Sequence, residues 1–394
     1  MLNKKLRTRL EMMCDMFFHF LPVNEKYVMF TSFWGQYNDN PKYISMELHK
    51  REPEYRQFWA ISANRSIEKD LPEYIHVCRY KSLKYYWYKN RSKYVIDNIV
   101  GDYSFFGDNI KHSWKIRMKN KKQVNISTWH GNPIKRIGRD LFPGRYLNND
   151  DFFSTSDLLI CGCNYVKDIF EKCFGGGPRV EITGTPRCDT MFEIAYDKDE
   201  LFSKLSIPKG KKVLLYAPTY RNNPNSSGIE QIRSLDIDKL LSLFSKKFGG
   251  DWVFVFRVHN SVLGILKNDP IFNNENIING NLGDDMMEYM QIADAMISDY
   301  SGAIFDYTHT ERPCFLYALD KKHYINEERG VYMEIENLPY TFAENAEMLY
   351  ESILNYKREE QISEIHRFNN WIGNKEDGKA SKRLVDIIIN KQIG

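Results

Sequence analysis

Short apolar runs of strand length alternate along the chain with longer segments in which apolar residues recur at helical spacing. This alternation is typical of a parallel sheet whose strands are joined by crossover helices. In the first half, strands are predicted over residues 27–33, 57–61, 94–97, 124–128, 158–162 and 180–183, and helices over 41–50, 83–89 and 165–172.

The same pattern starts again near residue 212. Strands are predicted over 212–217, 252–258, 277–279, 295–298 and 314–317, and helices over 237–248, 285–292 and the long tail 344–391. The polar segment 197–210, with Pro208 and Gly210, is the expected crossing between domains. We therefore predict an α/β fold with two doubly wound Rossmann-type domains, 26–196 and 211–394, that face a cleft. Ligands of such sheets lie beyond the carboxyl ends of the strands.

The first 25 residues predict an amphipathic helix. A helix places five apolar residues close to one face, with basic residues before them: Leu6, Leu10, Met13, Phe17 and Phe20, and Lys4, Lys5, Arg7 and Arg9. Such a helix fits either a contact with a membrane surface or a first helix packed on its own domain. Glu11, Asp15 and His19 interrupt the apolar run, and no stretch reaches the roughly 20 apolar residues of a membrane span.

Composition narrows the class of protein only a little. Among 394 residues, 42% are hydrophobic and 27% charged, as in an ordinary folded protein, and the net charge of +3 gives no general attraction to nucleic acid. The seven cysteines are scattered, and Cys161-Gly-Cys163 lacks the spacing of a zinc knuckle. We expect reduced thiols in a cytosolic compartment.

The first candidate for chemistry follows the strand predicted over 124–128, which leads directly into Trp129-His130-Gly131-Asn132-Pro133. A histidine at the end of a strand is a natural general base near neutral pH, and Gly131 lets the backbone approach a ligand closely. A turn that carries a structural histidine is the alternative.

Two strand ends of the second half suit a phosphate. Thr219, Tyr220 and Arg221 follow one strand, and an arginine fork binds phosphate oxygens well. Arg257 and His259 end the next strand and, because side chains alternate, point to the same side. Two cationic donors on one side would form a clamp for a diphosphate.

A third strand end combines small residues with the start of a helix. The segment 299–306 begins with an acid and contains Ser301, Gly302 and Asp306. Ser301 and Gly302 could offer hydroxyl and amide donors to a phosphate, and Asp306 could accept from a ribose or polyol hydroxyl. The alternative is simple helix capping by Asp299 or Ser301.

Taken together, segments 129–138, 216–221, 257–259 and 299–306 resemble the CDP-glycerol glycerophosphotransferases of teichoic acid synthesis. The patterns of that family are Trp-His-Gly-Thr-Pro-Leu-Lys, Tyr-Ala-Pro-Thr-(Trp/Tyr)-Arg, Arg-x-His and Asp-Tyr-Ser-Ser-x-x-Phe-Asp. Phe33-Trp34-Gly35, Asn40-Pro41 and the segment 183–189 also look like family elements. The chain departs from the family at Asn132, Asn260 and Gly302, which replace Thr, Pro and Ser.

The resemblance implies a GT-B-like enzyme, a CDP-glycerol glycerophosphotransferase. It would transfer glycerol phosphate, or a related polyol phosphate, from its CDP-linked donor to a hydroxyl of a lipid-linked or polymeric acceptor, releasing CMP. Residues 26–196 would carry the base, and 211–394 would bind the CDP-polyol. His130 and His259 would be catalytic, in either order of roles, and the substrate would meet Trp129, Gly131, Asn132, Pro133, Arg187, Thr219, Tyr220, Arg221, Arg257, Ser301, Gly302 and Asp306.

No metal and no cofactor is expected. Asp197-x-Asp199 and Asp236-x-Asp238 match the carboxylate pair of metal-dependent sugar transferases, but each precedes a helix, where aspartate is favoured as a cap. Basic residues gather in 111–122 and at Lys135, Arg136, Arg139 and Arg145. They form either a solvated face or a surface for an anionic acceptor or membrane, which would place the protein on the inner side of the cell membrane.

Two rival functions share this architecture. One is a nucleotide-sugar glycosyltransferase of the GT-B type, and the other is a non-catalytic binding subunit of an assembly complex for an envelope polymer. The sequence leaves open the choice between glycerol and ribitol, the choice between primase, polymerase and capsule decoration, the acceptor, and the oligomeric state.

Overall fold

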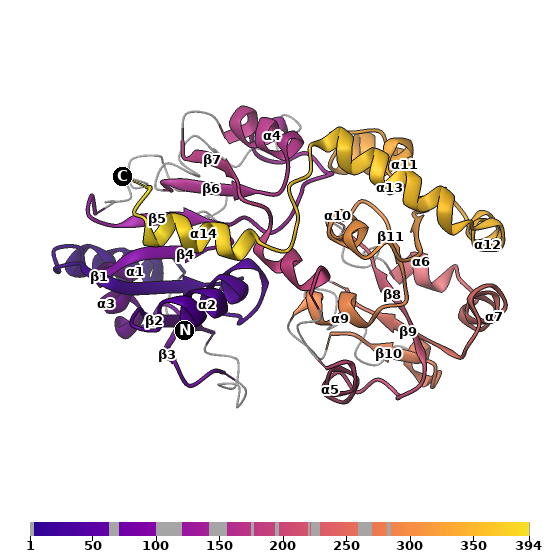
Figure 1. Cartoon of the computed structure of the whole chain (residues 1–394), viewed down its shortest axis with the longest axis horizontal. Coiled ribbons are helices and arrows are strands. Elements are labelled where there is room, and N and C mark those ends of the chain that lie inside the picture. Colours follow the sequence, from indigo (N-terminus) through magenta and orange to yellow (C-terminus); the bar gives the residue numbers. More distant parts are fainter. Residues whose placement is uncertain are drawn as a thin grey trace. The chain divides into compact units, whose positions relative to one another are not determined.

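The computed structural model describes residues 4–62, 71–99, 120–141, 156–174, 177–193, 197–219, 221, 229–258, 270–281 and 285–393. The chain forms two compact units, each built around one sheet (Figure 1). The first comprises Met1–His130, Tyr146–Asp189 and Lys375–Gly394, and the second comprises Gly131–Arg145 and Thr190–Asn374.

The sheet of the first unit has seven parallel strands in the order β3-β2-β1-β4-β5-β6-β7. Along β1 the apolar side chains alternate between two faces, so Val28 and Phe30 enter one core cluster and Met29 enters the other. The strands are β1 (Asn24–Thr31), β2 (Arg56–Ile61), β3 (Ile75–Arg79), β4 (Ser92–Asp97), β5 (Val124–Ser127), β6 (Leu158–Cys161) and β7 (Arg179–Ile182).

Helices cover both faces of this sheet. Helix α2 (Asp39–Arg51) and helix α14 (Ala380–Ile389) share one core cluster with the strands, and helix α3 (Leu83–Arg91) supplies the other. Helix α1 (Lys4–Phe18) packs on α3, where Phe18 meets Trp87 edge to face. Helix α4 (Asn164–Phe174) joins β6 to β7.

The sheet of the second unit has six parallel strands in the order β10-β9-β8-β11-β12-β13. Its buried strands are almost wholly apolar, as expected for a parallel sheet covered on both faces. The strands are β8 (Lys212–Ala217), β9 (Trp252–Phe256), β10 (Ile277–Asn279), β11 (Ala295–Ser298), β12 (Cys314–Tyr317) and β13 (Phe342–Ala343).

Helices of the second unit follow its strands. Apolar residues of α7 recur at helical spacing and face the sheet, and its first turn is capped by Asp236, which accepts from the Lys239 amide. The helices are α5 (Lys198–Lys204), α6 (Ile229–Arg233), α7 (Ile237–Phe248), α9 (Met286–Ile292), α10 (Ala303–Tyr307), α11 (Lys321–His323), α12 (Ala346–Asn355) and α13 (Arg358–Ile372). None of the described helices has the length and hydropathy needed to cross a bilayer.

Both sheets have the strand order of a doubly wound fold, which confirms the predicted fold class. The chain order reverses between β1 and β4 in the first sheet and between β8 and β11 in the second. Ligands of such folds bind beside these reversal points, at the carboxyl ends of the strands. We therefore expect a ligand to bind at the loops that follow β4, β5, β8 and β11.

The compact units differ from the predicted domain ranges in three segments. The shortest runs from Thr190 to the end of the predicted first domain and belongs to the second unit. Residues 375–394 were expected in the second domain but belong to the first unit, because Leu384, Val385 and Ile388 of α14 complete its core. Gly131–Arg145 was expected in the first domain but packs with the second unit. The boundary between the units falls between His130 and Gly131.

Candidate active-site residues

His130 lies beyond the end of β5 in the first unit. Its side chain is exposed, and its Nδ1 lies 3.0 Å from the carbonyl oxygen of Asn98, which follows β4. Because a carbonyl oxygen can only accept, Nδ1 carries the proton of the neutral imidazole and the lone pair is left on Nε2. Trp129 stacks on the imidazole, with ring centroids 4.3 Å apart. His130 is thus held in the tautomer that a general base needs.

A buried polar network holds the Asn98 loop in place. Asn98 Oδ1 accepts from the Phe33 amide at 3.0 Å, and Asn98 Nδ2 donates to Ser32 Oγ at 3.0 Å. Ser32 Oγ in turn donates to Asn38 Oδ1 at 2.6 Å. Sequence analysis identified Phe33 within a family element but missed Asn98, whose contact to His130 joins the ends of two neighbouring strands.

The buried side chain of Arg187 also contacts the backbone of the loop that carries His130. The Arg187 Nη1 atom lies 2.8 Å from Asp39 Oδ2 and donates to the carbonyl oxygen of His130 at 3.1 Å. Asn40 Nδ2 lies 3.2 Å from the carbonyl oxygen of Trp129. Arg187 and Asn40 are buried, so both act here on the backbone around His130. A contact of Arg187 with substrate stays a prediction.

Arg221 lies at the centre of a buried network in the second unit, beyond β8. Its Nε and Nη2 atoms donate to the two carboxylate oxygens of Asp320 at 2.7 and 3.1 Å. The Nη1 atom donates to the Thr219 carbonyl oxygen at 2.7 Å, and Nη2 lies 2.8 Å from Asp299 Oδ2. Burial disfavours the charge, but Asp299 and Asp320 more than offset this, so the pKa of Arg221 lies above its ordinary value.

Two aromatic rings complete the surroundings of this guanidinium. Its central carbon lies 5.0 Å from the ring centroid of Tyr300 and 4.7 Å from that of Tyr324, and the two rings are stacked on each other at 4.1 Å. Arg221 is 0% exposed. The guanidinium of Arg221 therefore stabilises the second unit through its hydrogen bonds and its contacts with the two rings. The sequence had predicted that Arg221 binds phosphate directly.

Asp299 joins the two strands at the reversal point of the second sheet. Its Oδ1 accepts from the Thr219 amide at 2.8 Å and from the Tyr300 amide at 2.7 Å. The Thr219 hydroxyl is buried and has no partner among the described residues. The loops after β8 and β11 are thus fixed to each other where a doubly wound fold binds its ligand.

Ser301 and Gly302 follow Asp299 and are both partly exposed. Ser301 Oγ accepts from the Ala303 amide at 3.3 Å, so Ser301 caps the first amide of the helix that follows, as one of the two predicted alternatives had it. The helix that follows, α10, has only five residues, so its dipole adds little to anion binding. Asp306 in this helix is 1% exposed.

Gly131, Asn132 and Pro133 connect His130 to the second unit. A Cβ atom on Gly302 would lie 2.5 Å from the Asn132 carbonyl oxygen, so the two loops are in close contact within this unit. Asn132 and Gly302 are two of the three positions where the chain departs from the family pattern, and the structure brings these two together.

Arg257 lies just beyond β9 and is partly buried. Its Nη1 donates to the Gly280 carbonyl oxygen at 2.7 Å, and its guanidinium lies over the Tyr289 ring at 4.8 Å. Tyr220 and His259 lie outside the described residues, as do Arg145 and most of the basic run 111–122. Their predicted roles stay predictions.

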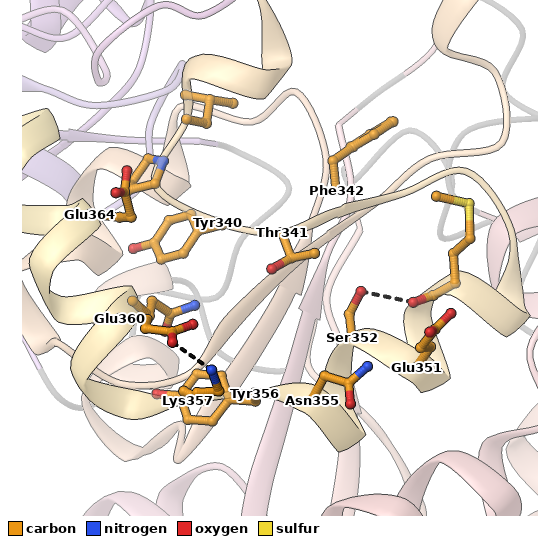
Figure 2. Close-up of a pocket in the computed structure, with 14 residues that line it drawn as sticks. Tyr340, Thr341, Phe342, Glu351, Ser352, Asn355, Tyr356, Lys357, Glu360 and Glu364 are labelled. Atoms are coloured by element: carbon orange, nitrogen blue, oxygen red, sulfur yellow. Dashed lines mark hydrogen bonds and ion pairs between the residues drawn. The ribbon is translucent and has the colours of Figure 1, made fainter.

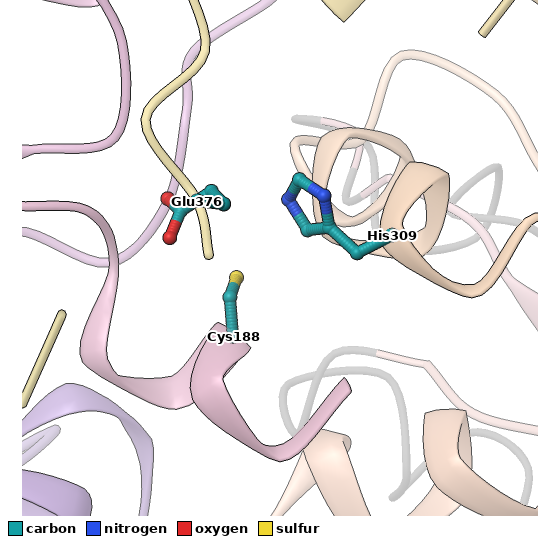
Figure 3. A group of neighbouring side chains, drawn as sticks. All are labelled: Cys188, His309 and Glu376. Atoms are coloured by element: carbon teal, nitrogen blue, oxygen red, sulfur yellow. The ribbon is translucent and has the colours of Figure 1, made fainter. Parts of the chain in front are cut away.

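A pocket and a group of three side chains involve other residues. A pocket of about 500 Å³ in the second unit is lined by the segment Leu338–Phe342, by α12 and by the start of α13, where Lys357 and Glu360 pair at 2.6 Å (Figure 2). Cys188 and Glu376 belong to the first unit, and His309 belongs to the second (Figure 3). The Glu376 carboxylate accepts from the Thr185 amide at 2.8 and 2.9 Å, so it has a structural role within the first unit.

Comparisons with known proteins agree with the motifs. The sequence profile of the family described as CDP-Glycerol:Poly(glycerophosphate) glycerophosphotransferase matches residues 13–390. The chain is 30% identical over 385 residues to the teichoic acid poly(glycerol phosphate) polymerase of Staphylococcus epidermidis, a match that covers 93% of this chain and 51% of that protein. The chain therefore spans about half the length of that relative.

Other relatives are of similar length. The teichoic acid glycerol-phosphate transferase of Staphylococcus aureus is 27% identical over 385 residues, which is 93% of each protein. A solved structure of a variant of the wall teichoic acid polymerase TagF, soaked with CDPG, superposes with a TM-score of 0.80 at 28% identity. That match covers 98% of this chain and 95% of the TagF chain.

Proposed function

Because the chain belongs to the CDP-Glycerol:Poly(glycerophosphate) glycerophosphotransferase family, we propose that it transfers glycerol phosphate from CDP-glycerol to a hydroxyl of a teichoic acid acceptor, releasing CMP. The observation that carries the proposal is the 3.0 Å contact between His130 Nδ1 and the Asn98 carbonyl oxygen. With Nδ1 donating to the Asn98 carbonyl oxygen, Nε2 is the basic nitrogen. This nitrogen can accept the proton of an acceptor hydroxyl, which is the step that a phosphotransferase adds to donor binding.

The reaction is an in-line displacement at the β-phosphorus. His130 Nε2 takes the proton of the acceptor hydroxyl as its oxygen forms a bond to the β-phosphorus. The bond from that phosphorus to the bridging oxygen breaks, and CMP leaves with both electrons. Cationic donors beyond β9 and the hydroxyl and amide donors of the Ser301–Gly302 turn beyond β11 stabilise the charge on the phosphates. The roles of His130 and His259 could also be exchanged.

The network around Arg221 supports this chemistry indirectly. It fixes Asp299, and with it the Ser301–Gly302 turn, at the reversal point of the second sheet. A rigid turn costs little reorganisation when a diphosphate binds, which is the main requirement of phosphoryl transfer. Arg221 thus serves as a positioning residue in the proposed site.

Helix α1 supports a location at the inner surface of the cell membrane. One face is committed to the first unit, because Glu11 pairs with Lys81 at 3.1 Å and Asp15 with Lys89 at 3.4 Å. On the other side, large apolar side chains are exposed: Leu10 (45%), Met13 (64%), Phe17 (76%) and, just beyond the helix, Phe20 (82%). Both alternatives of the sequence analysis are therefore supported, each by a different face of one helix.

We expect the protein to sediment with vesicles that contain anionic lipid, and to do so less at high salt. Replacing Met13, Phe17 and Phe20 together by serine should weaken vesicle binding at least about 10-fold, since each buried apolar side chain contributes about 1.5–3 kcal/mol. Met348→Ser with Leu354→Ser, which alters exposed apolar residues of α12, is the matched control. Equal binding to neutral and anionic vesicles would count against the membrane contact.

A further inference from the structure

We propose that Lys135 is a further donor-binding residue, whose ammonium group binds the diphosphate of the CDP-polyol beside the Ser301–Gly302 turn. This inference rests on the proposed function. It assigns a role to the lysine that ends the Trp-His-Gly-Thr-Pro-Leu-Lys family pattern, which the sequence analysis placed in a basic group and did not name among the substrate-binding residues.

The backbone at Lys135 is fixed to the second unit. Lys135 forms an antiparallel bridge with Val331, and on either side of it Ile134 O accepts from the Tyr332 amide at 2.8 Å and the Arg136 amide donates to Gly330 O at 3.1 Å. Ile134 is 0% exposed. Lys135 is therefore part of a rigid element of the unit that carries the Ser301–Gly302 turn.

This element lies against the turn itself. A Cβ on Gly302 would come within 2.5 Å of the Asn132 carbonyl oxygen. Gly302 has φ −60° and ψ −17°, a conformation open to any residue, so glycine is needed there for space and not for its backbone angles. The close approach places the segment that starts at Asn132 directly beside the predicted phosphate-binding turn.

The charges around Lys135 leave its ammonium without a partner. Asp299 and Asp320 are both engaged with Arg221, as described above. Within the part of the chain that the structure describes, Lys135 makes no hydrogen bond and no ion pair. Arg329, one of two nearby cations, donates from Nε to the Arg136 carbonyl oxygen at 3.2 Å. A bound anion would therefore supply the counter-ion that Lys135 lacks.

The electrostatic surroundings agree with this role. The pKa of Lys135 is lowered to about 8, mainly by burial and then by Arg329 and Arg221, while Asp299 and Glu328 act in the opposite direction. Lys135 is only partly exposed. An ammonium held near other cations without a counter-ion is unfavourable, and a diphosphate supplies both the opposite charge and acceptor oxygens. A bound diphosphate will raise the pKa of Lys135, so donor binding takes up a proton above about pH 8.

The test is isothermal titration of CDP-glycerol into the full chain between pH 6.5 and 9.5. The disubstituted diphosphate of CDP-glycerol does not ionise in this range, so the protein alone sets the pH dependence. We expect the wild-type Kd to rise as pH passes about 8. Lys135→Met should weaken binding about 10- to 100-fold at pH 7 and abolish that inflection, since a hydrogen bond to a charged group contributes about 1.5–3 kcal/mol.

Lys135→Arg keeps its charge across the whole range, so it should bind at pH 9.5 as well as at pH 7. Lys322→Met removes an exposed lysine of the same unit and should match the wild type. If wild type and Lys135→Met share one Kd and one pH profile, the role of Lys135 is wrong while the proposed function stands. If the wild type binds no CDP-glycerol at any pH, the proposed function itself fails. The wild-type pH profile remains decisive if Lys135→Met folds poorly.

Discussion

Replacement of His130 by alanine is expected to lower the turnover number about 10²- to 10⁴-fold, the usual contribution of a general base. The Kd for CDP-glycerol should change little. The reason lies in the position of the imidazole: it is exposed beyond β5, and its Nδ1 proton is committed to the Asn98 carbonyl oxygen. In the proposed mechanism Nε2 takes the proton of the acceptor hydroxyl, so its loss should affect turnover more than donor binding. Steady-state rates of CMP release and direct titration of the donor separate the two effects.

A second exposed histidine provides the control. His323 pairs only with Glu327, at 3.2 Å on the surface of the second unit, and His323→Ala should keep the wild-type turnover number. Asn98→Ala retains the backbone carbonyl group but removes the side-chain bonds to Phe33 and Ser32, so it should have an intermediate effect on turnover. A wild-type turnover number for His130→Ala would remove His130 from the role of base and leave His259 as the candidate.

The largest expected loss of stability comes from Arg221→Ala. This change leaves the carboxylates of Asp299 and Asp320 without the cation that both of them face, in a site where Arg221 and Asp299 have at most 1% of their side chains exposed. Breaking a buried ion pair by removal of one partner costs about 3–5 kcal/mol. Urea denaturation should show this as a lower free energy of unfolding.

The charges can be separated from the packing by a combined variant. Arg221→Met with Asp299→Asn and Asp320→Asn removes all three charges at once and should be more stable than Arg221→Ala, because no unpaired charge stays buried. Arg367→Ala breaks the exposed pair with Glu364 on α13 and should change the free energy of unfolding only slightly. A similar small change for Arg221→Ala would contradict the structural role of the buried network.

Local sequence pattern was sufficient to predict most of the strands. The strands at 212–217, 277–279, 295–298 and 314–317 were predicted to the residue, because fully buried parallel strands are short apolar runs between polar turns. Strand β3 was missed, since His76 and Arg79 break its apolar run at the edge of the sheet. Strand β13 has two residues, too few for a periodic pattern.

Long-range contacts limited the prediction of the candidate site. Arg221 was predicted to bind substrate, but its partner Asp320 is 99 residues away, so sequence alone could not show that the guanidinium is bonded within the chain. Asp189 lay in a segment noted for its family resemblance, yet its carboxylate accepts from the amides of Ala380 and Ser381 at the start of α14. Lys135 ends a family pattern and belongs to a basic group, but the sequence did not show that it lacks a counter-ion among the described residues.

The proposed reaction is tested most directly by product analysis. The purified chain is incubated with CDP-glycerol and a lipid-linked acceptor that ends in glycerol phosphate, and both products are identified by mass spectrometry. The proposal predicts one CMP released for each glycerol phosphate added through a new phosphodiester bond. A glycosidic bond formed from a nucleotide sugar would contradict it. So would the absence of any donor cleavage with every combination of CDP-polyol and acceptor.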